Sequence, residues 1–205
     1  MLGSITPLGE RGRGRNFSTT IVALTAGSML GGATCAIALW ILIHYASTAS
    51  GVSLSDRDRL GALGILCVVA GMVDTGLRIP IPRPTRQVNR GWLTTYRGWV
   101  YGVGFGVQLG MGFVTIVSTA ATYVVFVGAS IAPSALAAGT VGSVYGLTRA
   151  SMAWPGARVT TWDNWRKIEA FLAKYERAAD NAIVAVESSV GILALALVCL
   201  SVMTI

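Results

Sequence analysis

Five apolar runs, separated by short polar or basic segments, dominate the hydrophobic pattern of this 205-residue chain. A membrane-crossing helix needs about 20 mostly apolar residues, and each run is close to or above that length. A sixth stretch, residues 162–177, repeats its apolar side chains at spacings of three and four, which predicts an amphipathic helix lying in the cytoplasmic membrane interface. The five predicted spans cover residues 19–44, 60–77, 100–127, 135–152 and 181–205.

The third run carries an unusual ladder of glycines. Gly102, Gly106 and Gly110 recur every four residues, and so lie on one face of a helix. In lipid the helix still satisfies its own hydrogen bonds, and the missing side chains leave a groove that another helix can approach closely. We therefore expect residues 100–127 to form the central helix of an all-α membrane bundle. Small residues repeat in the same way in the first span (Ala23, Gly27, Gly31) and in the fourth (Ala138, Gly142, Gly146, Ala150).

The composition agrees with a membrane protein. Hydrophobic residues make up 53% of the chain and charged residues only 12%, against about 25% charged residues in soluble domains. The three cysteines, Cys35, Cys67 and Cys199, lie in apolar spans without a CxxC motif, so we expect inert core thiols rather than disulfides or zinc ligands. No nucleophile–base pair, metal cluster or phosphate loop can be assembled from the sequence, which predicts neither an enzyme nor a bound cofactor.

The basic residues predict the orientation. They gather in an N-terminal segment, residues 1–18, in the loop 78–97 and in the segment 149–177. By the positive-inside rule these parts are cytoplasmic, so residues 19–205 form one multi-pass domain of the plasma membrane with the C-terminus outside. Anionic lipid headgroups are the expected partner of the arginine-rich loops. Aromatic residues interleave with the arginines of the loop, but beside a span this mixture indicates a membrane belt rather than nucleic-acid binding.

Ionisable residues at membrane depth are functional candidates. Asp74, Arg149 and Glu187 lie near the cytoplasmic ends of the second, fourth and fifth spans. We expect Arg149 to pair with Glu187, or else with Asp74, and either to fix how two spans pack or to form an inner gate. For Asp74, an interfacial ion pair with neighbouring arginines is an equally open interpretation. His44 is expected to be a solvated boundary residue. The polar residues of the third run complete the candidate pathway: Gln108, Thr115, Ser118, Thr119 and Thr122.

Residues 23–28 (ALTAGS) and 135–140 (ALAAGT) are similar to each other, and they fall in spans of opposite direction, as in inverted-repeat transporters. With this echo, the run GFGVQLGMGFVT and the N-terminal SITPL, the chain resembles the CcdA/DsbD transmembrane family, which belongs with the LysE-like carriers. The resemblance implies two inverted three-helix halves, here with a truncated first half, and a part in moving reducing equivalents for cytochrome c maturation and periplasmic disulfide reduction. The family's two active cysteines correspond to Ser4 and Val114, so both thiols are absent.

Three functions follow from these observations. The first is a carrier-like protein that moves something other than thiol electrons, or that assists haem and thiol assembly. The second is a structural subunit whose glycine faces pack within a larger membrane complex, with another membrane protein as partner. The third is a thiol–disulfide carrier whose cysteines lie outside the family motifs.

Overall fold

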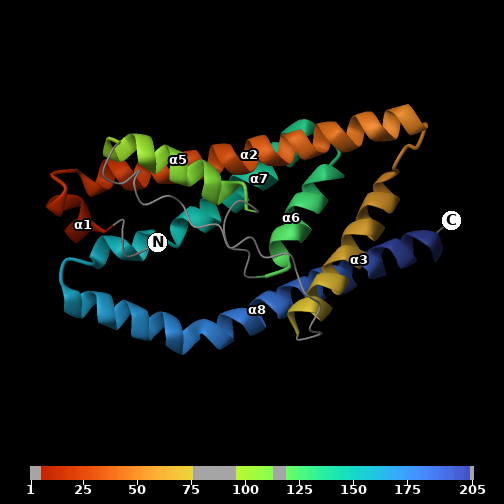
Figure 1. The fold of residues 1–205 in the computed structure, drawn as a ribbon. Coiled ribbons are helices and arrows are strands. Elements are labelled where there is room, and N and C mark those ends of the chain that lie inside the picture. The colour runs from red at the N-terminus through yellow and green to blue at the C-terminus, as the bar shows by residue number, and fades with distance from the viewer. Residues whose placement is uncertain (1–5, 76–95, 113–118, 204–205) are drawn as a thin grey trace.

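Helices form all the regular structure in the part of the chain described by the computed structural model, residues 6–75, 96–112 and 119–203 (Figure 1). The predicted all-α class is confirmed for these residues, which contain no strand. The helices are α1 (Pro7–Gly12), α2 (Phe17–Ser50), α3 (Asp56–Asp74), α5 (Gly98–Gly110), α6 (Ala121–Ser130), α7 (Ala135–Ser151), the 3₁₀ turn η2 (Trp154–Arg158) and α8 (Trp162–Met203).

Helix α2 is the axis around which the others pack. Its 34 residues make it about 51 Å long, and α5, α6 and α7 all lie along it. The glycine ladder of α5 faces α2, because a Cβ atom added at Gly106 or Gly110 would overlap backbone atoms of Leu24 or Ser28. In the other direction, Gly27 of α2 lies against the backbone of α5. The two backbones are therefore in direct contact, as only glycine faces allow.

Helix α7 packs on another side of α2 and runs antiparallel to it. Gly142 lies against Gly32, while Gly146, one turn further along α7, lies against Ser28. The Ser28 hydroxyl donates a buried hydrogen bond to the Gly146 carbonyl oxygen, 2.7 Å away. The small residues at spacing four in the fourth predicted span thus form the face of α7 that meets α2.

The expectation of one continuous helix over residues 100–127 is wrong. Helix α5 ends at Gly110 and α6 begins at Ala121. Gly112 has a positive φ of 72°, the left-handed conformation in which glycine commonly ends a helix. A Cβ atom at Gly112 would also lie 2.7 Å from the Phe126 ring. Because the run is interrupted, the central helix of the bundle is α2 rather than residues 100–127.

Helices α3 and α8 form an antiparallel pair at the side of the bundle. Gly64 of α3 lies against Leu195, and Gly71 lies against Ser188. Ser55 caps the start of α3 with a reciprocal capping box, as its position before an acidic first turn predicts.

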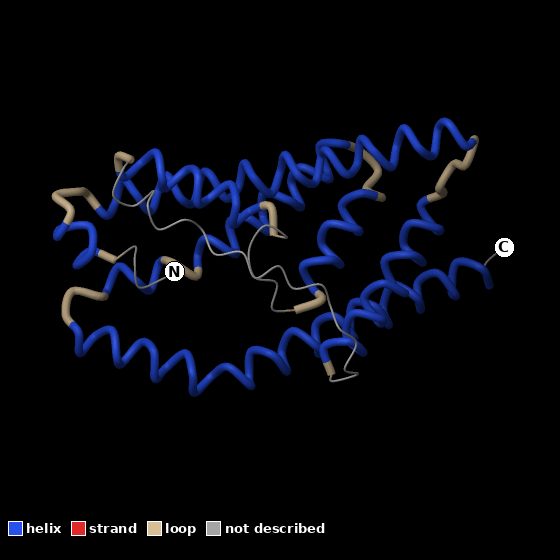
Figure 2. The backbone as a smooth tube through the Cα atoms, in the orientation of Figure 1, coloured by secondary structure: helices blue, strands red, loops and turns tan. Residues whose placement is uncertain are grey.

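The predicted interfacial helix and fifth span are a single helix. Helix α8 has 42 residues, about 63 Å or twice the hydrocarbon thickness of a bilayer, and Figure 2 shows it running without a loop between them. The expected boundary near residue 180 is absent because residues 176–179 (ERAA) contain neither glycine nor proline and favour helix.

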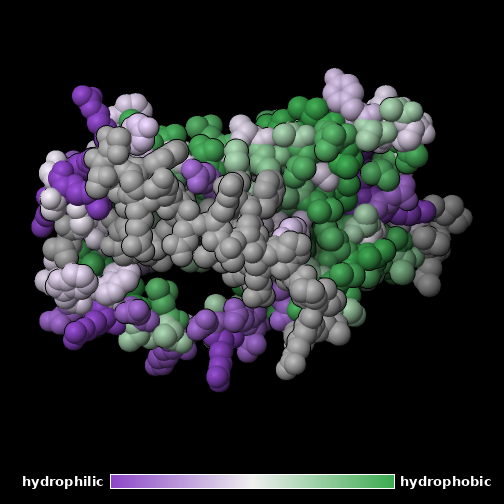
Figure 3. Space-filling view, in the orientation of Figure 1, coloured by the Kyte–Doolittle hydropathy of each residue, from purple (hydrophilic) through white to green (hydrophobic). Residues whose placement is uncertain are grey.

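Within the described residues, two helices are long and apolar enough to cross a membrane: Phe17–Ser50 and Trp162–Ser201. Large aliphatic side chains on their outer faces are exposed, among them Val22, Leu30 and Leu193, each at least 60% accessible. The visible face in Figure 3 separates hydrophobic residues over α2, α3 and α6 from hydrophilic residues near α1 and along the first half of α8. Exposed apolar faces of this extent are typical of contact with lipid or another protein.

Candidate functional site

Polar side chains from three helices meet at the first turn of α6. Asp74, the last residue of α3, accepts hydrogen bonds from the backbone N–H of Ala120 with both carboxylate oxygens, at 3.0 and 2.9 Å. The first N–H groups of a helix have no partner within the helix, and the helix dipole favours a negative charge there. Asp74 therefore caps α6 from a different helix.

Helix α7 brings a cation to the same turn. The Tyr145 hydroxyl donates to Thr122 Oγ1 at 3.2 Å and accepts from Arg149 Nη1 at 2.8 Å. The Arg149 guanidinium also lies over the Tyr145 ring, 5.7 Å from its centroid. Thr122 is buried. The chain of hydrogen bonds from Arg149 through Tyr145 to Thr122 therefore reaches the interior of the bundle.

Glu187 of α8 is the third charged residue at this place. Its side chain is only 6% exposed, and neither carboxylate oxygen has a hydrogen-bond partner in the described structure. Glu187 lies beside Gly71, where an added Cβ atom would be 3.8 Å from the Glu187 Cβ. Asp74 follows Gly71 by one turn on α3 and repels the Glu187 carboxylate electrostatically. Two acidic groups therefore lie close together at the break between α5 and α6.

We call Asp74, Thr122, Tyr145, Arg149 and Glu187 the α6-start cluster. Among the described residues no ion pair joins Arg149 to Glu187 or to Asp74. The expected pairing does not form because α7 packs on α2 whereas α8 packs on α3, so Arg149 is held by Tyr145 and Asp74 by the start of α6.

The remaining predicted pathway residues are distributed differently. Gln108 is half-buried on α5, and Thr119 is half-buried just before α6. Thr115 and Ser118 lie outside the described residues. Of the expected polar lining, the structure brings only Thr122 into the α6-start cluster. Tyr145 was missed by the sequence analysis, although its position four residues before Arg149 on one helix was a usable signal.

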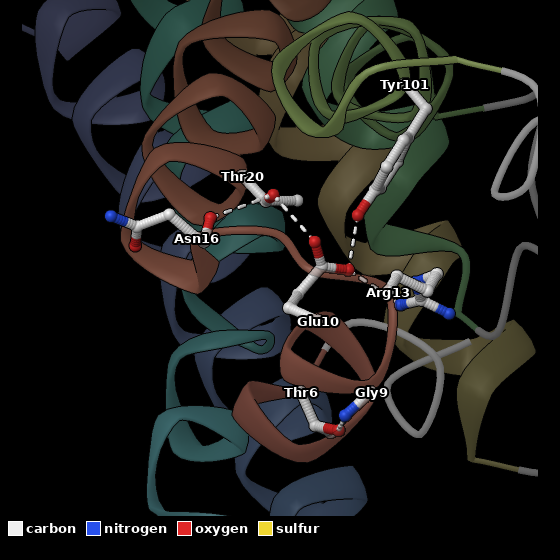
Figure 4. Close-up of polar contacts among 7 residues, drawn as sticks. All are labelled: Thr6, Gly9, Glu10, Arg13, Asn16, Thr20 and Tyr101. Atoms are coloured by element: carbon white, nitrogen blue, oxygen red, sulfur yellow. Dashed lines mark hydrogen bonds and ion pairs between the residues drawn. The ribbon is translucent and has the colours of Figure 1, made fainter.

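A second buried glutamate was also missed. Glu10 of α1 is fully buried and accepts hydrogen bonds from Arg13 at 2.6 Å, from Thr20 at 3.1 Å and from the Tyr101 hydroxyl (Figure 4). These partners come from the loop after α1, from α2 and from α5, so Glu10 ties three parts of the chain together. The sequence did contain a signal for α1: Thr6 followed by Pro7 is typical of a capped helix start, and Glu10 lies in the first turn of that helix.

The described residues contain no group of three or more His, Cys, Asp or Glu side chains able to hold a metal ion. The three thiols are free, and they lie on three different helices, α2, α3 and α8. Comparison of the chain with protein-family models, with curated proteins and with solved structures gives no match. The resemblance to the CcdA/DsbD family therefore stays a prediction.

Proposed function

We propose that this chain is a multi-pass membrane carrier in which the α6-start cluster binds a proton or a small metal cation. Helices α2, α3 and α7 and the second half of α8 each cross the bilayer once. Helices α5 and α6, of 13 and 10 residues, are about 20 and 15 Å long. Because neither reaches the roughly 30 Å of the hydrocarbon core, the two make one discontinuous crossing, the third along the chain and one of five in all.

In this proposal the N-terminus is cytoplasmic and the C-terminus is outside. The helix directions agree with five alternating crossings, since α5 runs parallel to α2, α7 runs antiparallel to α2, and α3 runs antiparallel to α8. The basic side chains near α1 and in the first half of α8 then lie on the cytoplasmic side. Anionic lipid headgroups are their proposed partners.

The buried, unpartnered carboxylate of Glu187 carries the proposal. An isolated buried charge costs several kcal/mol, and a proton or a bound cation removes that cost. Asp74 supplies a second carboxylate on the neighbouring helix. Membrane carriers often build ion sites where a helix is interrupted at membrane depth, since backbone groups freed there contribute to binding. The end of α5 at Gly110 and the start of α6 at Ala121 provide such an interruption.

Cation movement in reconstituted vesicles tests the proposal. The purified chain is placed in liposomes of phosphatidylethanolamine and phosphatidylglycerol, and flux down an imposed gradient is followed with internal pyranine for protons and with radioactive sodium. We expect faster flux of one of these ions than in protein-free liposomes. Glu187→Gln should reduce this flux at least tenfold, because the neutral amide takes up no proton and lacks the negative charge that attracts a cation.

Asp180→Asn is the matched control, since Asp180 lies on the same helix but is exposed. It should move the ion at the wild-type rate. Equal flux in wild-type and Glu187→Gln vesicles, or no flux above that of protein-free liposomes, would contradict an ion site at Glu187.

A structural subunit is the second candidate function, and the first half of α8 favours it. Phe171, Leu172 and Tyr175 share one face of α8 and are 60%, 47% and 47% exposed, and among the helices described α8 makes its main contacts through its second half with α3. An apolar face left open in this way suits another membrane protein. A stoichiometric partner retained after purification in mild detergent, and lost in Phe171→Glu, would support this function.

A further inference from the structure

A cavity lies at the opposite end of the bundle from α1, between the end of α2, the start of α3 and the turn that follows α6. Its volume is about 290 Å³, just below the roughly 300 Å³ at which small-molecule pockets usually begin. The walls differ in character: Trp40, Ile43 and Ile131 form an apolar side, whereas His44 and Arg59 supply polar groups. No acidic side chain is among the residues that line it.

The apolar wall is held in place. The Trp40 indole N–H donates to the Ala132 carbonyl oxygen at 2.9 Å. The His44 ring stacks on Trp40 with a centroid separation of 4.7 Å and an angle of 9° between the planes. The two stacked rings therefore form one aromatic wall of the cavity, against which an apolar group can pack.

Arg59 provides the charge, and part of its guanidinium has no partner. Its Nε donates to the Leu54 carbonyl oxygen at 3.3 Å. Its Nη1 is buried and makes no hydrogen bond within the described structure. Asp58 follows Arg57 on the same helix, but among the described residues it forms no ion pair with Arg59 and its Oδ2 accepts hydrogen bonds from Ser55. Other atoms of Arg59 line the cavity, so its positive charge is available to an anion bound there.

We propose that this cavity binds a small amphipathic oxyanion, with a phosphate or carboxylate group on Arg59 and a short apolar tail on Trp40, Ile43 and Ile131. Guanidinium groups bind phosphate and carboxylate oxygens through paired N–H donors. The site is separate from the α6-start cluster and does not depend on ion transport there. Both a free metabolite and a lipid headgroup present this chemistry.

Calorimetric titration of the full chain in a nonionic detergent tests the proposal. The probes are hexyl phosphate, which represents a free amphipathic anion, dihexanoyl phosphatidic acid, which represents a lipid headgroup, and hexanol, which has the tail without the charge. We expect hexyl phosphate or the phosphatidic acid to bind at least tenfold more tightly than hexanol. The tighter of the two anions identifies the source of the ligand.

Variants then test whether the anion binds at Arg59. Arg59→Gln should weaken anion binding at least tenfold, and Arg59→Lys should weaken it less. The matched control is Arg57→Gln, because Arg57 is on the same helix but donates to the Ser201 carbonyl oxygen at 2.8 Å, away from the cavity. Its affinity should change less than twofold.

A cavity-filling variant, Ile131→Trp, keeps Arg59 intact and should also weaken binding, which separates loss of the site from loss of folding in Arg59→Gln. Melting curves of all variants in the same detergent identify any that fail to fold. Equal anion binding by Arg59→Gln and Arg57→Gln, hexanol binding as tight as hexyl phosphate, or no binding of either anion would each overturn the proposal.

Discussion

Glu10 and Glu187 are both buried glutamates at a junction between helices, yet their surroundings are opposite. Glu10 accepts hydrogen bonds from three side chains, whereas Glu187 accepts none in the described structure. The helices around them differ as well. Near Glu10, α2 and α5 meet backbone to backbone through glycines; near Glu187, α3 and α8 meet mainly through side chains.

The difference separates a rigid region around Glu10 from a region around Glu187 whose conformation can change. A satisfied buried network fixes one arrangement, and glycine faces leave no room for adjustment. An unpartnered carboxylate is unfavourable in the same setting, and such groups are commonly retained where a ligand or proton completes them. We therefore interpret the α1–α2–α5–α7 unit as the scaffold, and α3, α6 and α8 as the parts that would respond in the proposed ion binding.

The largest effect is expected from Gly106→Leu. A Cβ atom at Gly106 would overlap the Leu24 carbonyl oxygen and lie 2.8 Å from the Ser28 amide nitrogen, so α5 must move away from α2. We expect a loss of more than about 4 kcal/mol, in the range reserved for core disruption, seen as failure to recover folded protein. The milder pair Gly106→Ala and Gly61→Ala provides the control, since a Cβ at Gly61 meets only Val198 at 3.9 Å. If both alanine variants melt like wild type, the scaffold is not held by backbone contact.

Glu10→Met comes next. It keeps the length of the side chain but removes the acceptor for Thr20 and Tyr101, whose hydroxyls it leaves without that partner, as well as the ion pair with Arg13. Breaking a buried charged contact in this way costs about 3–5 kcal/mol. Unfolding of the detergent-solubilised variant should show a loss of that order. A loss no larger than that of Glu176→Met, a change at an exposed position of α8, would show that Glu10 does not tie α1 to the bundle.

The same substitution at Glu187 is expected to have the opposite sign. Methionine removes two acceptors that make no hydrogen bond among the described residues, together with the repulsion from Asp74. The gain in stability should be about 1–3 kcal/mol, the usual penalty of an unsatisfied buried group. A destabilised Glu187→Met variant would mean that the carboxylate contributes to folding, and the contrast between the two glutamates would fail.

The smallest effect is expected for the thiols. Cys35, Cys67 and Cys199 are free and lie on separate helices. Replacing all three by alanine or serine should change the free energy of unfolding by no more than about 1 kcal/mol and should leave ion flux unchanged. A mixed disulfide trapped between this chain and a thioredoxin-like protein would instead restore the thiol-carrier function that the CcdA/DsbD resemblance suggests.

Local signals in the sequence predicted local features well. Ser55 and its acidic neighbours indicated a helix start, and the small residues of α7 at spacing four indicated the face that meets α2. The end of α5 near Gly112 was harder to predict, because a glycine within a glycine-rich helix and a glycine after a helix look alike in sequence. What distinguishes Gly112 is the contact with Phe126 and Tyr145, and those residues follow it by more than a dozen positions.

The partners of the charged residues could not be predicted from spacing. Arg149 and Glu187 fall at similar membrane depth in the predicted topology, but depth does not say which helices are neighbours. The backbone N–H of Ala120 as the partner of Asp74 required a helix start inside a run that reads as continuous. Glu10 was missed for a related reason: its three donors come from residues 3 to 91 positions away.

Because α8 is continuous, a small tilt at Glu187 moves the distant end of the helix by several ångströms. Between Trp162 and Glu187 the helix has no break, and 25 residues correspond to about 37 Å. A tilt of roughly 10° about Glu187 would therefore carry the Trp162 end through about 6 Å, calculated from that length. A tilt that leaves Glu187 in place against α3 thus becomes, at the far end of α8, a displacement large enough to change a contact with a partner or with the membrane surface.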